Sequence, residues 1–366
     1  MTKRTAELKD EHNKLGAQFT EWNNIDVVEA YSSVNEEEEV DAVRDAAGMF
    51  DLTGLRKIWV KGPDARDVLN KTCSREIGNL KKGKSTYTLV LTDDGTICDD
   101  AIIYGIEDDK FLFVHGTGTG GDRLLKAAEG KDMTAQWDND LHTISVQGPK
   151  AVDILDPNAD GDIAGMKFFE VITTNLFGRE VILSRTGYSG EKGYEIFCER
   201  ADAVHLWQNL LEAGKPEGLK PCSFTGLDKV RVEAGLLFYP YDANENVTPW
   251  EAGLGFAVSK KKSEFLGRDA ALSKEGKENI MVRGIACKSD DPVIEAETEL
   301  YQDGKKVGDV ISPSYSRRLG KSIAIVHVQP DVTEGATLTL GNGSDAREVT
   351  VENLPFYDKE KLRPRA

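Results

Sequence analysis

Two stretches of the chain place carboxylates where a strand would otherwise be apolar. Glu195 lies in the hairpin-like segment RTGYSGEKGYEIF (185–197), which also carries Tyr188. Asp99 and Asp100 interrupt the apolar stretch ICDDAII. A carboxylate that faces a protein interior is unfavourable unless it is paired or is used for binding or catalysis. These acids are therefore the first candidates for a functional site.

The candidate acids suit two kinds of chemistry. Glu195 can accept two parallel hydrogen bonds from a ring that carries an amino group beside a ring N–H, as pterins and guanine-like rings do. Tyr188 can pack alongside such a ring. Because side chains alternate along a strand, one of Asp99 and Asp100 faces inward. An inward Asp can transfer protons, or it can be held structurally by an Arg or a backbone N–H.

Arg231 is a further candidate on a predicted helix. Its segment, LDKVRVEAGLL, has apolar residues at helical spacing. The simplest alternative to a ligand-binding role is a surface pair between Glu195 and Arg231, which would contribute little to stability.

A glycine-rich segment resembles a dinucleotide fingerprint but lacks its context. FLFVHGTGTGGDRLL contains G-x-G-x-x-G at Gly116, Gly118 and Gly121. A dinucleotide site requires this motif after the first strand of a βαβ series, whereas here a hairpin precedes it and another follows. We interpret the segment as a loop that lets a ligand ring lie against the backbone.

Composition limits the class of protein. The chain has 366 residues, which predicts two or three domains. Its 46 basic and 63 acidic residues give a net charge of −17, which disfavours nucleic acid and anionic membranes as partners. The sequence shows no long apolar run and no apolar signal region. Five cysteines without a CxxC pair indicate reduced thiols in the cytoplasm, and the scattered histidines predict no metal site.

The elements that position these residues form an internal repeat. VKGPDARDVL (60–69) and VQGPKAVDIL (146–155) share the pattern V-x-G-P-x-A-x-D-x-L. Each follows an apolar strand, begins a helix at its Pro, and is later followed by a strand hairpin. The repeat places CDDA and GYEI on corresponding strands. From about residue 280 short alternating runs predict a small all-β domain, and the final residues KEKLRPRA are expected to form a loose tail.

Nine segments, taken in order, resemble the aminomethyltransferase family, which comprises the glycine-cleavage T-protein and tetrahydrofolate-dependent demethylases. They are AVRDAAGMFDLT, VKGPDA, YTLVLTDDGTICDD, VQGPKA, RTGYSGEKGYEI, GLDKVRVEAGLLFY, ANENVTPWEAGLGF, FLGRDAAL and SPSYSRRLGKSIAIVHV. They cover nearly the whole chain.

The resemblance implies an α+β fold, a three-domain cloverleaf around a central folate channel. Two related strand–helix–hairpin units would be followed by a C-terminal β-barrel domain. The expected domains are a discontinuous folate-binding domain (1–52 and 142–258), a second α+β domain with the catalytic Asp (53–141), and the barrel domain (259–366).

The resemblance also implies roles for individual residues. Asp99 corresponds to the proposed catalytic acid, and Glu195 would bind the pterin. The other expected contacts of tetrahydrofolate are Tyr87, His115, Tyr188 and Arg231. Aromatic residues that could enclose a cationic donor are Trp22, Tyr31 and Trp250.

The implied activity is one-carbon transfer to tetrahydrofolate in the cytoplasm. The segment TEWNNIDVVEAYSS and the pair Pro240–Tyr241 differ from the T-protein pattern where the family meets its donor. We therefore favour a small methylated sulfonium or amine donor, with 5-methyltetrahydrofolate as product. The alternatives are glycine-cleavage aminomethyl transfer from a lipoylated carrier protein, giving 5,10-methylenetetrahydrofolate and ammonia, and a non-catalytic folate-binding iron–sulfur assembly factor.

Overall fold

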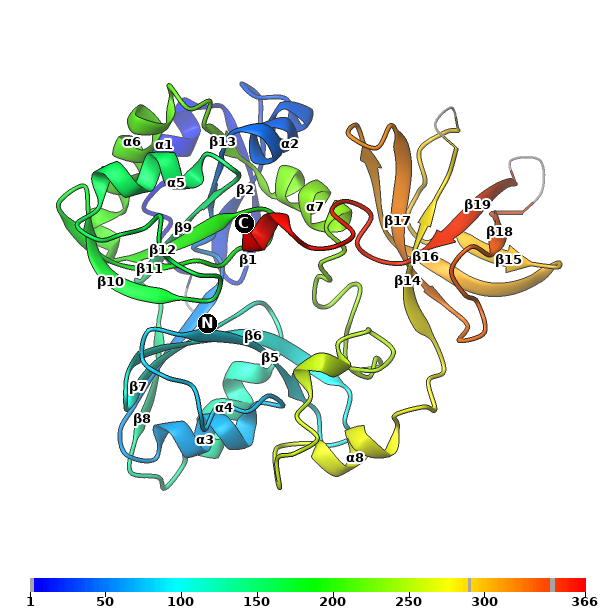
Figure 1. Cartoon of the computed structure of the whole chain (residues 1–366), viewed down its shortest axis with the longest axis horizontal. Helices are drawn as coiled ribbons and strands as arrows, with labels where there is room; N and C mark the ends of the chain where they lie inside the picture. Colours follow the sequence, from blue (N-terminus) through cyan, green and yellow to red (C-terminus); the bar gives the residue numbers. More distant parts are fainter. Residues whose placement is uncertain (1–2, 289–290, 343–345) are drawn as a thin grey trace.

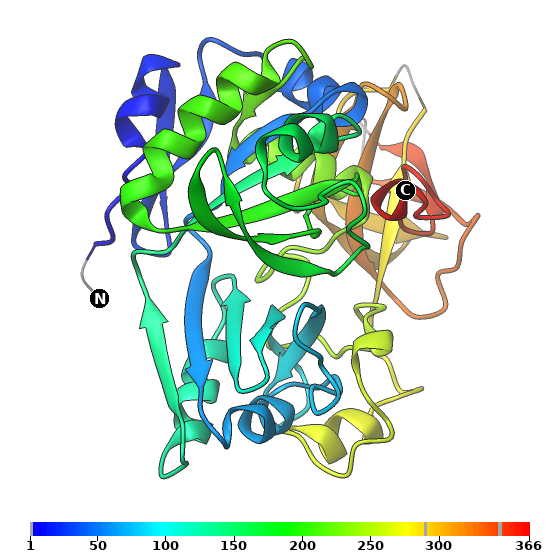
Figure 2. The same cartoon turned by 60° about the vertical axis from the view of Figure 1, so that its left-hand side comes forward.

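Two open sheets, one two-stranded ribbon and a closed barrel make up the chain, in three lobes (Figures 1 and 2). The computed structural model describes residues 3–288, 291–342 and 346–366. Its helices are α1 (Lys9–Lys14), α2 (Glu36–Asp45), α3 (Ala65–Thr72), α4 (Gly120–Ala128), α5 (Ala151–Leu155), α6 (Arg200–Gly214), α7 (Phe224–Glu233) and α8 (Arg268–Ser273). None of these helices has the length and apolar character needed to cross a membrane.

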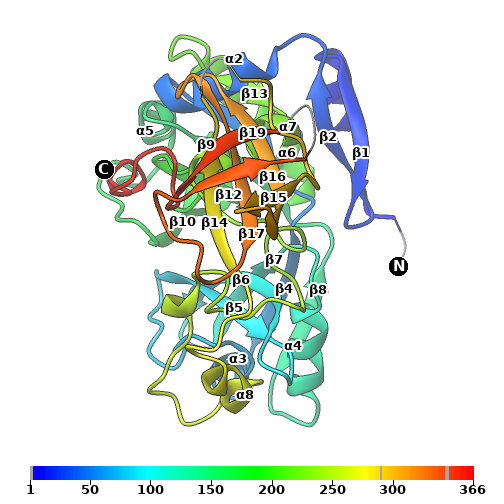
Figure 3. The ribbon, with the colours of Figure 1, turned by 90° about the vertical axis from the view of Figure 1, so that its right-hand side faces the viewer.

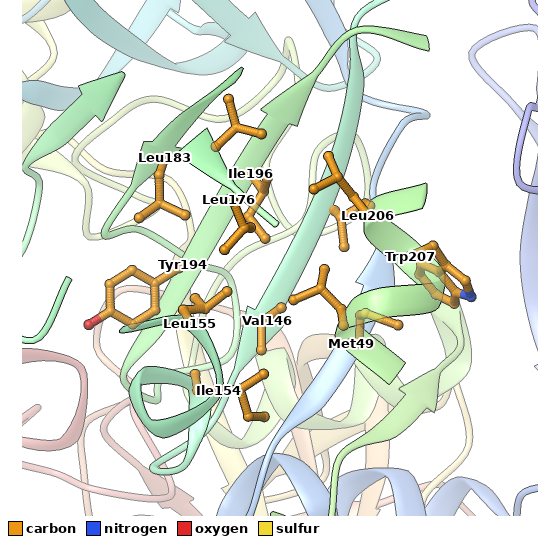
Figure 4. Packing of buried hydrophobic residues seen from close by; sticks show 14 of the residues in the cluster. Met49, Val146, Ile154, Leu155, Leu176, Leu183, Tyr194, Ile196, Leu206 and Trp207 are labelled. Carbon is orange, nitrogen blue, oxygen red and sulfur yellow. The ribbon is translucent and has the colours of Figure 1, made fainter. Parts of the chain in front are cut away.

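The first sheet has the order β10-β11-β12-β9-β3-β13. Its strands are β3 (Gly48–Asp51), β9 (His142–Gln147), β10 (Val171–Leu176), β11 (Arg179–Ser184), β12 (Gly193–Cys198) and β13 (Lys220–Cys222). Figure 4 shows the core on one face, where Leu206 and Trp207 pack with Met49 and Val146. The buried residues of α6 recur at three- and four-residue spacing, which explains why this helix presents one apolar side to the sheet.

The second sheet has the order β5-β6-β7-β4-β8. Its strands are β4 (Arg56–Lys61), β5 (Ser85–Leu91), β6 (Ile97–Glu107), β7 (Lys110–His115) and β8 (Thr134–Asp138). One face packs on α3 and α4 through Val68, Leu69 and Leu124. The other face turns towards the first sheet, where Tyr104 and Phe197 join a shared cluster. Strand β6 therefore has one side in its own core and one at the domain junction.

The barrel closes in the order β14-β17-β16-β15-β18-β19. Its strands are β14 (Met281–Ala286), β15 (Glu299–Gln302), β16 (Lys305–Ser316), β17 (Lys321–Val328), β18 (Thr337–Leu340) and β19 (Arg347–Glu352). Alternate residues fill its interior, as the period-two pattern predicted. The predicted α+β fold with a C-terminal β-barrel is confirmed.

Strands β1 (Ala17–Trp22) and β2 (Ile25–Tyr31) form an antiparallel ribbon at the side of the first lobe (Figure 3). The tip of this ribbon reaches the second lobe, because the Nε1 of Trp22 donates a hydrogen bond of 2.7 Å to Thr117. The segment with the altered family pattern thus spans both open sheets.

The segment after α7 packs differently from the expected domain division. Ala243, Val247, Ala252 and Ala257 form a cluster with residues of β5 and β6 such as Leu89. The expected domain division places this stretch, up to residue 258, with the first sheet. Its apolar residues instead pack against β5 and β6 of the second sheet.

The C-terminal segment is not the loose tail that its composition predicted. It returns from the barrel to the first lobe (Figure 1). Arg363 donates hydrogen bonds of 2.6 Å to the Glu191 carboxylate and to the carbonyl of Arg44. The guanidinium of Arg44 lies over the ring of Tyr357 at 4.5 Å. Basic residues that looked like a solvated tail therefore serve as partners for buried acids.

Candidate active site

The adjacent carboxylates of β6 point to opposite faces of the second sheet. Asp99 pairs with Val90 across the β5–β6 ladder, and Asp100 pairs with Leu89. Val90 belongs to the helix-covered core, whereas Leu89 faces the junction between the domains. Asp99 is accordingly fully buried. The residue that faces the junction is Asp100, so the ligand-facing position expected for Asp99 belongs to its neighbour.

Asp100 lines a small cavity at this junction. The cavity measures about 10 Å³, close to the space that one water molecule needs. Its walls are Tyr87, Leu89, Ile97, Asp100, Leu237, Tyr239, Ala243 and Leu254. Burial, followed by the charge of Asp99, raises the pKa of Asp100 to about 7. The cavity thus holds a carboxyl group that can exchange a proton near neutral pH.

Tyr87 lies where a ligand-lining residue was predicted. Its hydroxyl shares a hydrogen bond with Asp100. Its ring stacks on Phe256, with centroids 6.3 Å apart, and Phe256 is 65% exposed. Tyr87 therefore connects the carboxyl group of the cavity with an aromatic ring at the protein surface.

The field in the cavity is that of acids. Burial raises the pKa of Tyr239, and the nearby acids Glu245, Asp99 and Asp100 add to this effect. Coulombic repulsion of this kind favours a neutral or cationic ligand near Tyr239 over an anionic one.

Glu195 joins the two sheets. It is 5% exposed on β12, and its Oε2 accepts a hydrogen bond of 2.9 Å from Tyr104 of β6 and a second one from Thr186. Burial raises the pKa of Glu195, although both hydrogen bonds act in the opposite direction. Both bonds fall on Oε2, so Oε1 is the atom that remains for a ligand.

Strand β6 presents Asp100, Ile102 and Tyr104 on one face, because alternate residues share a side. Four residues of strand span about 13 Å. The Glu195 carboxylate stands at the Tyr104 end of this face and the cavity at the Asp100 end. Both features therefore lie along one strand.

Tyr188 contacts the segment after α7. Its hydroxyl donates a hydrogen bond of 2.5 Å to the carbonyl of Leu237, the residue whose side chain lines the cavity. Its ring packs against the cluster that contains Phe50 and Leu227. The hairpin that carries Tyr188 and Glu195 thus also holds one wall of the cavity.

Arg231 makes no pair with Glu195. It is 2% exposed and binds Asp228, Asp242 and Ser312, the last at 3.0 Å. Although burial opposes it, the charges of Tyr188, Asp242 and Asp228 raise the pKa of Arg231. The surface pair considered from the sequence is therefore wrong. Arg231 links α7 to β16 of the barrel, and its position beside Tyr188 keeps it close to the hairpin.

His115 does not line the cavity. It is 2% exposed and its Nδ1 lies 2.7 Å from Oδ2 of Asp99 on the helix side of the sheet. The expectation that its loop faces the ligand is wrong for this side chain, because β7 pairs His115 with Ala101, one position away from Asp100. The alternation of side chains along a strand thus explains why both Asp99 and His115 face away from the cavity.

Trp22 belongs to an aromatic cluster outside the cavity. Its ring centroid lies 5.7 Å from that of Phe224 and 6.3 Å from that of Phe238. Phe238 in turn stacks on Tyr241 at 5.6 Å, and Tyr241 is 63% exposed. Leu237 and Tyr239, the neighbours of Phe238, line the cavity. We call Trp22, Phe224, Phe238 and Tyr241 the aromatic rim.

Tyr31 and Trp250 lie away from this rim. The hydroxyl of Tyr31 bonds to His12 at 2.9 Å, and His12 lies 3.1 Å from Asp51, all within the first lobe. Trp250 donates to the carbonyl of Ala271 at 2.8 Å and packs beside α8. Each ring has a structural partner, and the expectation that these two rings enclose a donor stays a prediction.

Comparisons with known proteins match almost the entire chain. The model of the GCVT N-terminal domain matches residues 8–262, and that of the glycine cleavage T-protein C-terminal barrel domain matches residues 281–358. The chain belongs to the glycine cleavage T-protein family.

Relatives within this family carry more than one name. The chain is 38% identical to the heme-dependent oxidative N-demethylase gamma subunit of Ectopseudomonas mendocina, over 98% of this chain and 97% of that protein. It is 35% identical to an aminomethyltransferase of Corynebacterium aurimucosum, over 97% of this chain and 98% of that protein. The crystal structure of glycine cleavage system aminomethyltransferase T from Bartonella henselae superimposes with a TM-score of 0.89 at 25% identity, covering 97% of this chain and 98% of that one.

Family membership makes this protein an enzyme of tetrahydrofolate-dependent one-carbon transfer, as predicted, with tetrahydrofolate as cofactor. The residues present fit that group. A pterin has an amino edge for a carboxylate and flat apolar faces, and the junction offers Glu195 at one end and apolar walls such as Leu89 and Leu237 at the other. The junction thus offers a carboxylate and apolar side chains, which are the kinds of group that a pterin contacts.

Several site residues of this T-protein family member were missed from the sequence. Tyr104, Thr186 and Tyr239 are the main ones, and Asp100 was assigned the outer face. The register of β5 with β6 carries the signal for Asp100, since Tyr87 and Leu89 share its face. Tyr239 lies in LLFYPYDANEN, a segment noted only for its departure from the family pattern. No local pattern indicates Thr186, whose role depends on the fold of the hairpin.

A larger groove of about 800 Å³ lies elsewhere between the two sheets of this family fold. Trp59, Lys110, Val171 and Phe197 are among its lining residues. It contains none of the site residues predicted from the sequence, so the candidate active site rests on the smaller cavity and the contacts around it.

Proposed function

We propose that the protein transfers a one-carbon unit from a donor nitrogen to tetrahydrofolate, with the carbon at the oxidation level of formaldehyde. In this reaction a donor R₂N–CH₂–X loses its amine, and the cofactor nitrogen N5 supplies the accepting electron pair. The products are R₂NH, HX and 5,10-methylenetetrahydrofolate, so no external oxidant or reductant is needed.

The names of the relatives support this oxidation level. An oxidative N-demethylase removes a methyl group from nitrogen with oxidation of the carbon, and an aminomethyltransferase moves a carbon already bonded to nitrogen at that level. Both concern carbon on nitrogen. The sequence alone favoured methyl transfer from a sulfonium or amine. The shared chemistry of the two names now favours the aminomethyl oxidation state instead.

The single observation that carries the mechanism is the position of Asp100. Its carboxyl group lies in the cavity, bonded to Tyr87, with its pKa raised to about 7 by burial and by the charge of Asp99. Asp100 can therefore give a proton to the leaving amine nitrogen and receive one afterwards. Tyr87 orients the Asp100 carboxyl through its hydroxyl.

Glu195 binds and orients the cofactor in this proposal. Tyr104 and Thr186 hold Oε2 in place, and Oε1 would accept from the amino edge of the pterin. Orientation of two reactants in this way removes much of the entropic barrier. The small cavity has space for about one water molecule, so it would limit hydrolysis of the one-carbon unit.

The aromatic rim is proposed to bind the donor. Its rings lie beside the cavity walls, and the acids around Tyr239 favour a cationic amine. A cation beside aromatic rings gains about 0.5–2 kcal/mol, depending on how far water is removed. We propose a small amine-derived donor, which another subunit can supply by oxidising an N-methyl group. Transfer from a lipoylated carrier protein is the second candidate, on the 35% identity to an aminomethyltransferase.

The test uses product identity. The protein is incubated with tetrahydrofolate, ¹³C-formaldehyde and excess dimethylamine, which together form the N-hydroxymethylamine, and the product is followed by ¹³C NMR. We expect 5,10-methylenetetrahydrofolate to form faster than with the Asp100→Asn variant or without protein. Formation of 5-methyltetrahydrofolate from a sulfonium or methylamine would contradict the proposal. Ammonia release with an aminomethylated lipoyl carrier would support the second candidate.

A further inference from the structure

The side chain of Asp99 is fully occupied by donors on the far side of β6 from the cavity. Its Oδ2 lies 2.7 Å from Nδ1 of His115 and accepts a hydrogen bond of 2.9 Å from the backbone N–H of Gly120. Its Oδ1 accepts a bond of 3.0 Å from the backbone N–H of Asp100. Gly120 is the first residue of α4, so the positive end of the helix dipole faces the carboxylate. Three donors suit an ionised carboxylate rather than a carboxylic acid.

The ring of His115 is arranged as a neutral donor. Its Nε2 is buried and has no hydrogen-bond partner among the described residues. Gly121 lies against this atom, since a Cβ at that position would be 2.7 Å from it. The ring centroids of Phe113 and Trp137 lie 5.3 and 5.6 Å from that of His115. A proton on Nε2 would have no acceptor, whereas a proton on Nδ1 bonds to Asp99. The pair of Asp99 and His115 therefore keeps one net negative charge.

This charge lies directly behind Asp100, because the backbone N–H of Asp100 donates a hydrogen bond to the Asp99 carboxylate. We propose that the buried Asp99–His115 pair is a positioning device, which fixes Asp100 in the cavity and places a net negative charge behind its carboxyl group. The inference rests on the proposed function, in which Asp100 moves the proton. It assigns Asp99 and His115 a role through Asp100, without contact with either reactant.

Other charged or titratable groups face this arrangement from each neighbouring element. Tyr87 on β5 donates to Asp100, and Tyr188 of the hairpin lies beyond Tyr87. From the segment after α7, Tyr239 and Glu245 add a phenol and a further negative charge. Three cations lie on the neighbouring elements. Arg56 pairs with His115 across the β4–β7 ladder and lies over the ring of Trp137 at 4.2 Å. The charge of Arg123 acts on Asp93 and Cys98, and that of Arg231 acts on Tyr188. Burial is the largest cause of the raised pKa of Asp100, and the charge of Asp99 is the second.

The first experiment compares pH profiles of the transfer reaction. Removal of the Asp99 charge in Asp99→Asn should lower the proton affinity of Asp100. The limb of the profile that reports Asp100 should then move to lower pH by about one to two units, whether the acid or its anion is the active form. A loss of rate with the limb unmoved would show that Asp99 is merely structural and would overturn the inference.

Two histidine variants separate charge from packing. His115→Gln retains a donor for Asp99 without changing the charge of the pair. The limb of the pH profile that reports Asp100 should therefore stay in place in this variant. A move to higher pH would show that His115 carried a positive charge and would overturn the inference. His142→Gln is the matched control, since His142 is equally buried and also has an unpartnered Nε2, but its Nδ1 bonds to the carbonyl of Asp140. It should leave the limb unmoved.

The second measurement requires no turnover and is made on the unaltered protein, with a variant used only for assignment. With ¹⁵N-labelled histidine the protein gives signals from five histidines, and His115 can be assigned by its absence in His115→Gln. We expect a protonated Nδ1 and an unprotonated Nε2 for His115 between pH 6 and 8. A doubly protonated ring in this range would overturn the inference. The result holds even where no donor is turned over. Failure of the proposed function can therefore be distinguished from failure of this inference.

Discussion

The hydroxyl of Tyr104 on β6 donates a hydrogen bond of 2.9 Å to the Glu195 carboxylate on β12. The two open sheets, which belong to different parts of the chain, thus meet at the residue expected to bind the pterin. Asp100 lies on the same face of β6 as Tyr104. Any relative movement of the sheets would therefore change both the pterin contact and the geometry around the reacting carboxyl group.

Glu195→Gln should weaken the binding of tetrahydrofolate. Loss of a charge-assisted partner costs about 1.5–3 kcal/mol, which is roughly one to two orders of magnitude in Kd. Titration calorimetry measures this effect. Glu180→Gln, at an exposed position on the neighbouring strand β11, is the control and should leave the Kd unchanged. An unchanged Kd for Glu195→Gln, with native circular dichroism, would remove the pterin-binding role.

Asp100→Asn should retain tetrahydrofolate binding and lower kcat by about 10²–10⁴-fold, as expected for a group that transfers a proton. Steady-state kinetics with the N-hydroxymethylamine donor and calorimetry with the cofactor test the two halves separately. If the variant kept its kcat, positioning of the reactants alone would have to explain the rate, and Asp100 would lose its role.

Asp100 should also make stability depend on pH. Its pKa is raised from 3.8 to about 7 in the folded protein, by burial and then by Asp99. Between these values the folded state binds the extra proton, so the free energy of unfolding falls as pH rises. Asp100→Asn removes this dependence and should be stabilised relative to the wild type by a few kcal/mol at pH 8, and by much less at pH 4. Melting temperatures across this range measure the difference; a constant difference would contradict the raised pKa.

Trp22→Ala should raise the KM of the donor and leave that of tetrahydrofolate nearly unchanged. A cation beside aromatic rings loses about 0.5–2 kcal/mol when one ring is removed, or roughly two- to thirtyfold in KM. Tyr31→Phe is the control, because Tyr31 bonds to His12 away from the rim. Equal effects of the two variants on the donor KM would show that the aromatic rim does not bind the donor.

Arg363→Ala should weaken tetrahydrofolate binding although Arg363 is expected to touch neither reactant. Its bond to Glu191 holds the hairpin between β11 and β12, which carries Tyr188 and leads to Glu195. Loss of the bond leaves Glu191 with Arg44 alone and should loosen this hairpin. Hydrogen exchange of the hairpin amides and the Kd for tetrahydrofolate should change together. Lys359→Ala, which removes an exposed pair with Glu352, is the control.

The sequence predicted those parts of the fold that depend on local periodicity. Alternating apolar residues indicated the barrel, and the repeated V-x-G-P pattern indicated the paired strand–helix units. The facing of Asp99 and Asp100 failed by one residue because strand alternation has a period of two, so a single shift exchanges the faces. Only the pairing of Leu89 with Asp100, a fact of register, resolves this choice.

The site itself was accessible from the sequence only in part. A buried Glu195 beside Tyr188 could be recognised because a carboxylate on a strand requires a partner. Its partner Tyr104 lies 91 positions away and could not be predicted from local pattern. Tyr31 and Trp250 were equally plausible aromatic residues, yet each is held by a hydrogen bond that only the tertiary structure reveals.

The contact between Arg363 and Glu191 spans 172 positions, and that between Arg363 and Arg44 spans 319. During synthesis, Arg363 is therefore added long after the hairpin and α2 have been made. A nascent or truncated chain that ends before Arg363 contains each residue assigned here to the cofactor. It lacks the contact with Glu191 that holds the hairpin between β11 and β12. Contacts of such long range also form slowly. The cofactor site is therefore expected to reach its final structure late in folding.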